Sequence, residues 1–266
     1  MARSALSASH VKDFIRLLSA NAQAHSPAEK FRDWCELSYC AFAQLTAFDP
    51  AREDALEARY LSIVQRYNED LRFIRDTCPE LVAIAQLEVS QGGNDFLGDV
   101  AGQLEVLNPG AGQFFTPFEV SRLLARMTLD TDIDAIIARD GYVTFSEPAA
   151  GAGSMILACA DTLQQRGHRP DIHMLVHAVD VSALAYYMLF LQLTWRVIPA
   201  LVQRANTLSL EVFEGAYTPA CAGFHAHHGH LSFVPPGHPA SASPAPALPD
   251  VIEPPAAAIP TQLSLL

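Results

Sequence analysis

Two glycines and one acid carry the chemistry that this sequence indicates most clearly. Gly151 and Gly153 follow a β-rich run (residues 142–145) and precede a helical stretch that begins at Ser154. A glycine-rich turn between a strand and a helix lets a nucleotide-like ligand approach the backbone and the helix N-terminal amides. Asp180 closes the next apolar strand, where an acid is placed to accept hydrogen bonds from both hydroxyls of a ribose.

This turn and acid would suit either NAD or S-adenosylmethionine (SAM), and the neighbouring residues separate the two. A dinucleotide-binding turn has the pattern GxGxxG with small apolar residues before it. Here Glu147 and Pro148 open the turn, and Ile156 stands at the third glycine position. The pattern therefore favours SAM.

A helix start lies about 30 residues upstream of the glycine turn, in residues 112–119. Thr116 is the expected N-cap, Pro117 the first helical residue, and Glu119 the partner in a capping box. Apolar residues then follow on one helical face: Val120, Leu123, Leu124 and Met127.

Taken in order, residues 113–117, residues 147–153 and Asp180 resemble motifs X, I and II of the gamma-type DNA adenine-N6 methyltransferases. The nearest kin are the modification subunits of type I restriction systems, which residues 95–99 and the helical N-terminal region also resemble. The resemblance spans about residues 90 to 210. It implies a bacterial or mobile-element protein with a SAM cofactor and a DNA substrate.

The resemblance also implies a cofactor-binding set. In that family the Phe-Thr-Pro segment closes over the methionine end of SAM, and motif I lines the methionine and the ribose. The motif II acid holds the ribose hydroxyls, and a polar residue after the third strand faces the adenine. The matching positions are Phe115, Thr116, Pro117, Glu147, Pro148, Ala149, Gly151, Gly153, Asp180 and Asn206.

The catalytic motif of the family has no counterpart in this sequence. The family uses an Asn/Asp-Pro-Pro-aromatic box to bind the target amine and to stack the flipped base. The nearest candidate is residues 233–237, after a possible fourth strand at residues 231–234. Val234 cannot accept that hydrogen bond and Gly237 cannot stack a base, so the catalytic residues are unknown.

Histidine and cysteine suggest no metal site. His225, His227, His228 and His230 are spaced by two, one and two residues, unlike a usual zinc site, and a polar surface loop is the favoured alternative. The five cysteines form no CxxC pair, which predicts reduced thiols packed as small hydrophobic groups.

The element pattern predicts an α/β protein of three parts. Residues 1–110 read as a helical domain, whose simplest interpretation is a bundle with no chemistry of its own. Residues 111–235 alternate strands and helices, which predicts βαβ units and a truncated Rossmann-like methyltransferase sheet. Residues 236–266 are rich in Pro and Ala and predict a disordered tail.

The charge balance argues against DNA binding by this chain alone. The net charge is −12, and no Lys or Arg follows Arg204. Because DNA affinity depends on cations that displace counterions from phosphates, DNA contact would need an arginine patch or a basic partner subunit. We expect a cytoplasmic protein, since no apolar run is long enough for a membrane span.

Residues 262–266 form a short apolar peptide after the Pro/Ala-rich segment. The sequence resembles the peptide with which many bacterial replication and repair proteins bind the sliding clamp, with Leu in place of the final aromatic residue. An accidental apolar segment is the alternative. The expected contact residues are Gln262, Leu263, Ser264, Leu265 and Leu266.

Two functions follow from these patterns. The first is a SAM-binding DNA adenine-N6 methyltransferase-like protein of the restriction-modification type, inactive without a partner. The second is a non-catalytic SAM-binding or interaction module that is tethered to the sliding clamp or to restriction-modification subunits.

Overall fold

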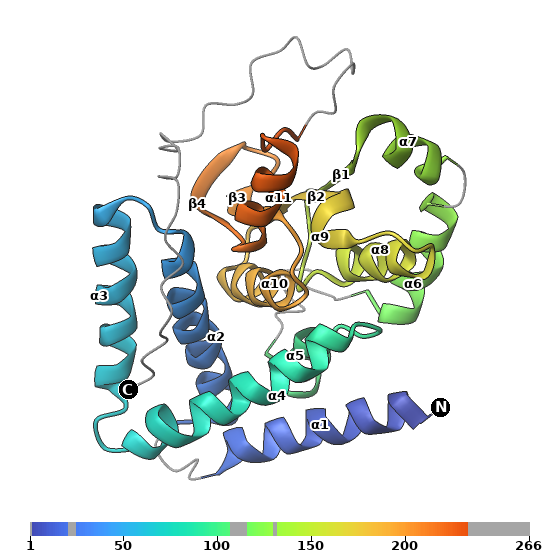
Figure 1. Ribbon diagram of the computed structural model, residues 1–266. Helices are drawn as coiled ribbons and strands as arrows, with labels where there is room; N and C mark the ends of the chain where they lie inside the picture. The colour runs from blue at the N-terminus through green and yellow to red at the C-terminus, as the bar shows by residue number, and fades with distance from the viewer. Residues whose placement is uncertain (1, 21–24, 107–115, 130–131, 234–266) are drawn as a thin grey trace.

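The computed structural model describes residues 2–20, 25–106, 116–129 and 132–233. Figure 1 shows a central sheet with helices on either side of it and a layer of N-terminal helices beyond them. Phe115 and the whole of residues 234–266 lie outside the described residues, so the tail and the candidate clamp peptide remain predictions from sequence.

The N-terminal part of the chain is helical, as the sequence predicts. Its helices are α1 (Ala2–Ser19), α2 (Pro27–Ala43), α3 (Pro50–Arg66), α4 (Cys78–Gln91) and α5 (Phe96–Gln103), with a 3-10 turn at Gln44–Thr46 and a π-helical turn at Phe73–Thr77.

Local capping explains several of these helix starts. Ser26 and Glu29 form a capping box at the start of α2. The predicted start of α3 is confirmed, because the Asp49 side chain accepts a hydrogen bond from the Ala51 amide and Pro50 is the first helical residue.

The α/β part contains a four-stranded mixed sheet in the order β1-β2-β3-β4. The strands are β1 (Val143–Glu147), β2 (Met174–Asp180), β3 (Ala200–Asn206) and β4 (Glu211–Tyr217). The first three are parallel and confirm the predicted βαβ units, whereas β4 returns antiparallel to β3. The connecting helices are α8 (Ser154–Gln165), the short α9 (Pro170–His173) and α10 (Ala183–Trp195), and α6 (Phe118–Leu129) and α7 (Ile133–Asp140) precede the sheet.

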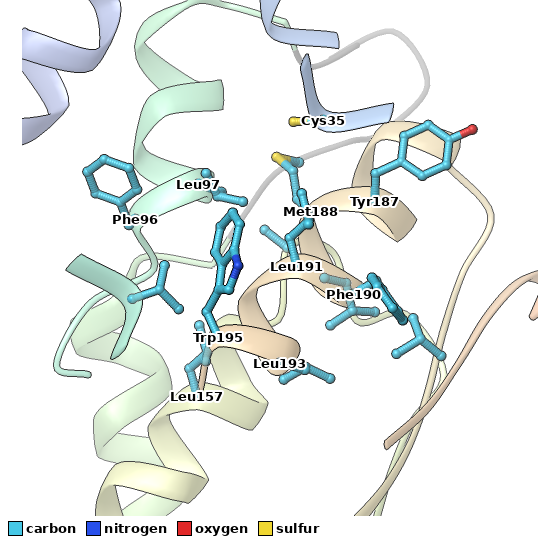
Figure 2. Close-up of a cluster of buried hydrophobic side chains, with 14 of the residues drawn as sticks. Cys35, Phe96, Leu97, Leu157, Tyr187, Met188, Phe190, Leu191, Leu193 and Trp195 are labelled. Atoms are coloured by element: carbon cyan, nitrogen blue, oxygen red, sulfur yellow. The ribbon is translucent and has the colours of Figure 1, made fainter. Parts of the chain in front are cut away.

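Helix α10 lies between the sheet and the N-terminal helices (Figure 1). It is buried almost all round, as expected of a helix covered on every side. Figure 2 shows Leu191 and Trp195 pointing toward Phe96 and Leu97 of α5, while Phe190 points away from them. One continuous cluster of buried side chains therefore joins the helical layer to the sheet.

Polar side chains of α2 and α3 form hydrogen bonds across the same interface between the helical layer and the sheet. The Tyr39 hydroxyl is 2.7 Å from the Tyr186 hydroxyl of α10 and donates to Glu214 of β4 at 2.7 Å. Arg59 of α3 donates to Glu214 at 2.9 Å and also pairs with Glu36. Burial and the nearby Glu214 carboxylate raise the pKa of Tyr39 far above its usual value, so the hydroxyl keeps its proton.

Three predictions about the start of α6 are wrong: Thr116 as the N-cap, Pro117 as the first helical residue and Glu119 as the partner in a capping box. The helix begins at Phe118, and the Pro117 carbonyl accepts its first intrahelical bond, so Thr116 is not the N-cap. Glu119 bonds to Arg122 on the surface. The helix packs against α8 through small residues such as Ser121 and Ala125, and its large apolar face is exposed: Val120, Leu123, Leu124 and Met127.

The predicted fourth strand is also wrong. Leu231 and Phe233 form no strand but pack as irregular chain against Tyr142, Leu175 and Phe224. The fourth strand is β4, which follows a tight turn after Asn206. Several of its side chains are exposed, so no clean alternation of buried and exposed residues marked it in the sequence.

The histidine cluster forms part of helix α11 (Ala220–His228), so the prediction of a surface loop is wrong for three of the four histidines. His228 packs on Phe224 and Tyr142 and is 2.8 Å from the Ile172 carbonyl oxygen. His225, His227 and His230 are exposed, as the prediction of a surface position requires, and only His228 is partly buried. No group suited to a metal ion occurs among the described residues.

The five cysteines carry free thiols, as predicted. Burial raises the pKa of Cys40, Cys78 and Cys159 to about 12, which keeps these thiols protonated and unreactive.

No helix in the described part of the chain is long and apolar enough to cross a membrane.

Candidate functional site

The carboxyl ends of the three parallel strands bring the predicted site residues to one edge of the sheet. Glu147, Asp180 and Asn206 are the last residues of β1, β2 and β3. In open α/β sheets, ligands bind outside this edge. Three polar side chains that are far apart in sequence therefore border a single region.

The glycine turn that follows β1 requires unusual backbone angles. Gly151 and Gly153 have φ of 56° and 103°, a region that side-chain-bearing residues rarely adopt. The Ala150 amide donates to the Val179 carbonyl of β2 at 2.9 Å, which closes the turn against the sheet. Gly153 is also the N-cap of α8, whose first-turn amides have no intrahelical acceptor and face the same edge.

Asp180 holds the turn as well as bordering the site. One carboxylate oxygen accepts from the Gly151 amide at 2.8 Å, and the other accepts from the Ser182 amide at 2.8 Å. Each oxygen has a further lone pair, so the half-buried carboxylate can still accept from two ligand hydroxyls.

Glu147 and Pro148 lie at the opening of the turn. Glu147 accepts a hydrogen bond from the Ala149 amide at 3.3 Å. The Thr207 hydroxyl donates to the Pro148 carbonyl at 2.6 Å, which ties the turn after β1 to the segment after β3. Pro148 and Ala149 are exposed at this edge.

Asn206 uses its side-chain oxygen locally. This oxygen accepts from the Leu208 amide at 3.0 Å and from the Ser209 amide at 3.2 Å. Such a turn fixes the amide plane, and the NH₂ group, which bonds to no described residue, can donate to a ligand.

The start of α6 is tied to the glycine turn. Ser154, the first residue of α8, has its hydroxyl 2.8 Å from that of Ser121 and donates weakly to the Thr116 carbonyl at 3.3 Å. The structure thus brings Thr116 and Pro117 beside the turn, although both are exposed.

The sequence alone missed three residues near this edge. Arg204 pairs in register with Asp180 and lies over the Phe213 ring at 5.2 Å. Gln192 reaches the turn from its buried side, and Asp95 bonds to Gln192 behind it. The signal for Gln192 was available, because a lone glutamine in a strongly apolar helix has to find buried partners.

Comparison with known proteins gives one match. Residues 96–215 match the family model of N-6 DNA methylase, and this range contains every predicted cofactor-binding residue that the structure describes. No curated protein and no solved structure matches the chain. The match supports a DNA N6-adenine methyltransferase-like function for this part of the chain, in agreement with the motif resemblance.

The turn geometry predicts unequal effects for glycine substitutions at the two ends of α8, at Gly153 and Gly167. A Cβ at Gly153 would lie 2.9 Å from Leu189 Cδ1, whereas a Cβ at Gly167, also at positive φ, meets nothing within 4 Å. Both Gly→Ala changes add about 1–2 kcal/mol of backbone strain. Gly153→Ala should cost about 1–3 kcal/mol more from overpacking. Urea unfolding measures the free energy of unfolding of both variants. Equal losses of stability would contradict the close packing of Leu189 against the turn.

Proposed function

We propose that the chain binds SAM at the carboxyl edge of its sheet, as a methyltransferase-like unit of the restriction-modification type with a truncated Rossmann-like fold. The observation that carries this proposal is the Asp180–Gly151 arrangement at the end of β2, within the region that matches the N-6 DNA methylase family. The domain division remains the one proposed from sequence, at residues 1–110, 111–235 and 236–266.

The residues present fit the chemistry of this cofactor. Asp180 accepts hydrogen bonds, as the two ribose hydroxyls require, and the Asn206 amide can donate to adenine. The first-turn amides of α8 favour a negative group such as the methionine carboxylate. Glu147 can accept from the methionine ammonium group. Phe115, Thr116 and Pro117 would close over the methionine end.

Bound SAM would supply an electrophilic methyl group for direct transfer to an adenine N6 amine. This chain's own residues bind and orient the cofactor. Nothing in the described residues replaces the missing Asn/Asp-Pro-Pro-aromatic box, since residues 231–233 pack beside Phe224 as irregular chain. We therefore propose that DNA contact and the base pocket depend on a partner subunit, in the cytoplasm of a bacterium. The alternative, a non-catalytic SAM-binding module, is favoured by the same missing box.

Cofactor binding is tested by titration calorimetry with SAM or S-adenosylhomocysteine. Asp180→Ala removes the charged acceptor and should weaken binding by about 1.5–3 kcal/mol. Asp171→Asn changes an acid in α9, at the opposite end of β2, and should leave the affinity unchanged. No binding by the unaltered chain at millimolar SAM would reject the proposed cofactor.

Methyl transfer by the chain alone should be undetectable. The chain lacks the Asn/Asp-Pro-Pro-aromatic box, and its net charge is negative rather than positive. The assay follows label from SAM to duplex DNA, with an active adenine methyltransferase as positive control. Transfer that Gly151→Asp abolishes would show that the chain carries a complete catalytic site.

We also propose that residues 262–266 bind a bacterial sliding clamp. Three leucines contribute up to about 1.5–3 kcal/mol each when fully buried, less the cost of ordering the peptide, which predicts micromolar affinity. A peptide of residues 258–266 should bind the clamp of the host, and Gln262→Ala with Leu265→Ala should abolish binding. Absence of binding at a hundred micromolar peptide would reject this partner.

A further inference from the structure

Gln192 is a fully buried amide at the centre of the interface between α10, α5 and the glycine turn. Its Nε2 donates to the Asp95 carboxylate at 2.7 Å and to the Ala152 carbonyl at 2.7 Å. Its Oε1 accepts from the Leu97 amide at 3.2 Å. Both ends of the amide are therefore in use, and its orientation is fixed.

Asp95 fixes that orientation from the helical layer. It is buried as the N-cap of α5, and its Oδ1 accepts from the Gly98 amide as well as from Gln192. A Cβ at Gly98 would lie 2.4 Å from Asp95 Oδ2, so a glycine is needed there for the carboxylate to fit. Because Asp95 Oδ1 already accepts from the Gly98 amide and the Ala152 oxygen is a carbonyl, Gln192 presents its NH₂ group to both.

Ala152 lies between the two glycines of the turn and is itself buried. Its carbonyl shares a rigid peptide plane with the Gly153 amide, which donates to the Ala150 carbonyl at 2.9 Å. Holding the Ala152 oxygen therefore sets the direction of the next amide and the start of α8. Asp180 holds the Gly151 amide from the exposed side of the same turn.

We propose that Gln192, oriented by Asp95, is a positioning residue for the cofactor site, and that α5 of the helical layer thereby forms part of that site. The inference rests on the proposed function, because the turn is taken to be the cofactor-binding turn. It extends that function to residues that lie behind the turn and touch no ligand.

Substitutions separate this role from simple packing. Gln192→Leu keeps a side chain of similar volume but removes the hydrogen-bond partner of the Ala152 carbonyl and of the Leu97 amide. Asp95→Ser keeps an N-cap hydroxyl for the Gly98 amide but removes the carboxylate to which the Gln192 NH₂ group donates. Gln203→Leu is the matched control, because Gln203 lies on the opposite face of the sheet with His177 as its partner.

The experiment uses the full chain and three measurements: thermal unfolding, S-adenosylhomocysteine affinity well below the unfolding temperature, and amide hydrogen exchange over residues 149–155. We expect Gln192→Leu and Asp95→Ser to weaken affinity at least tenfold and to speed exchange in the turn. Gln203→Leu should change the affinity less than twofold.

The outcomes distinguish the two proposals. A lower unfolding temperature with unchanged affinity and unchanged exchange would show a purely structural role and overturn the inference. If the unaltered chain binds no cofactor, the proposed function fails, while hydrogen exchange still tests whether Gln192 positions the turn. If Gln192→Leu does not fold, Asp95→Ser, which keeps an N-cap for α5, decides in the same way.

Discussion

The burial of α10 on every side constrains the rest of the structure. Its sequence, from Ala183 to Trp195, is strongly apolar and carries no charged residue, and the sheet can cover only one side of it. Helices α2, α4 and α5 cover the remainder. Without them, large side chains such as Met188, Leu191 and Trp195 would be exposed at about 1.5–3 kcal/mol each. The helical layer and the sheet therefore stabilise each other.

In an interface this apolar, the few polar groups determine how α10 is oriented. A buried donor or acceptor without a partner costs about 1–3 kcal/mol, so each polar side chain that α10 brings inside has to be matched. Tyr186 meets Tyr39 near one end of the helix, and Gln192 meets Asp95 and Ala152 near the other. These contacts fix the rotation of α10, and with it the positions of Asp180 before the helix and of the glycine turn beside it.

The sequence predicted the elements whose signals are local, and missed those that depend on neighbours. Asp49 with Pro50 marks a helix start, and the Gly151 turn with Asp180 marks the ends of two strands, because cap and turn chemistry lies within a few residues. Helical spacing in α6 revealed an apolar face but not whether anything covers it, and Leu123 is exposed. Strand β4 was missed because, with Val212 and Phe213 both exposed, an edge strand lacks a clean alternation. The role of Gln192 follows only from three segments meeting in space.

The strand order has a further consequence for the chemistry. Methyl transfer needs a donor site and an acceptor site side by side. In the proposed function the methyl donor binds at the carboxyl ends of β1, β2 and β3, and β4 extends the sheet on the β3 side. On the other side, β1 has no strand partner among the described residues, and this edge lies next to Glu147 and the glycine turn. An acceptor pocket beside the methyl group would have to be built along that edge. The net charge of −12 gives this chain little attraction for DNA there, which is why the proposed function assigns DNA contact to a basic partner subunit.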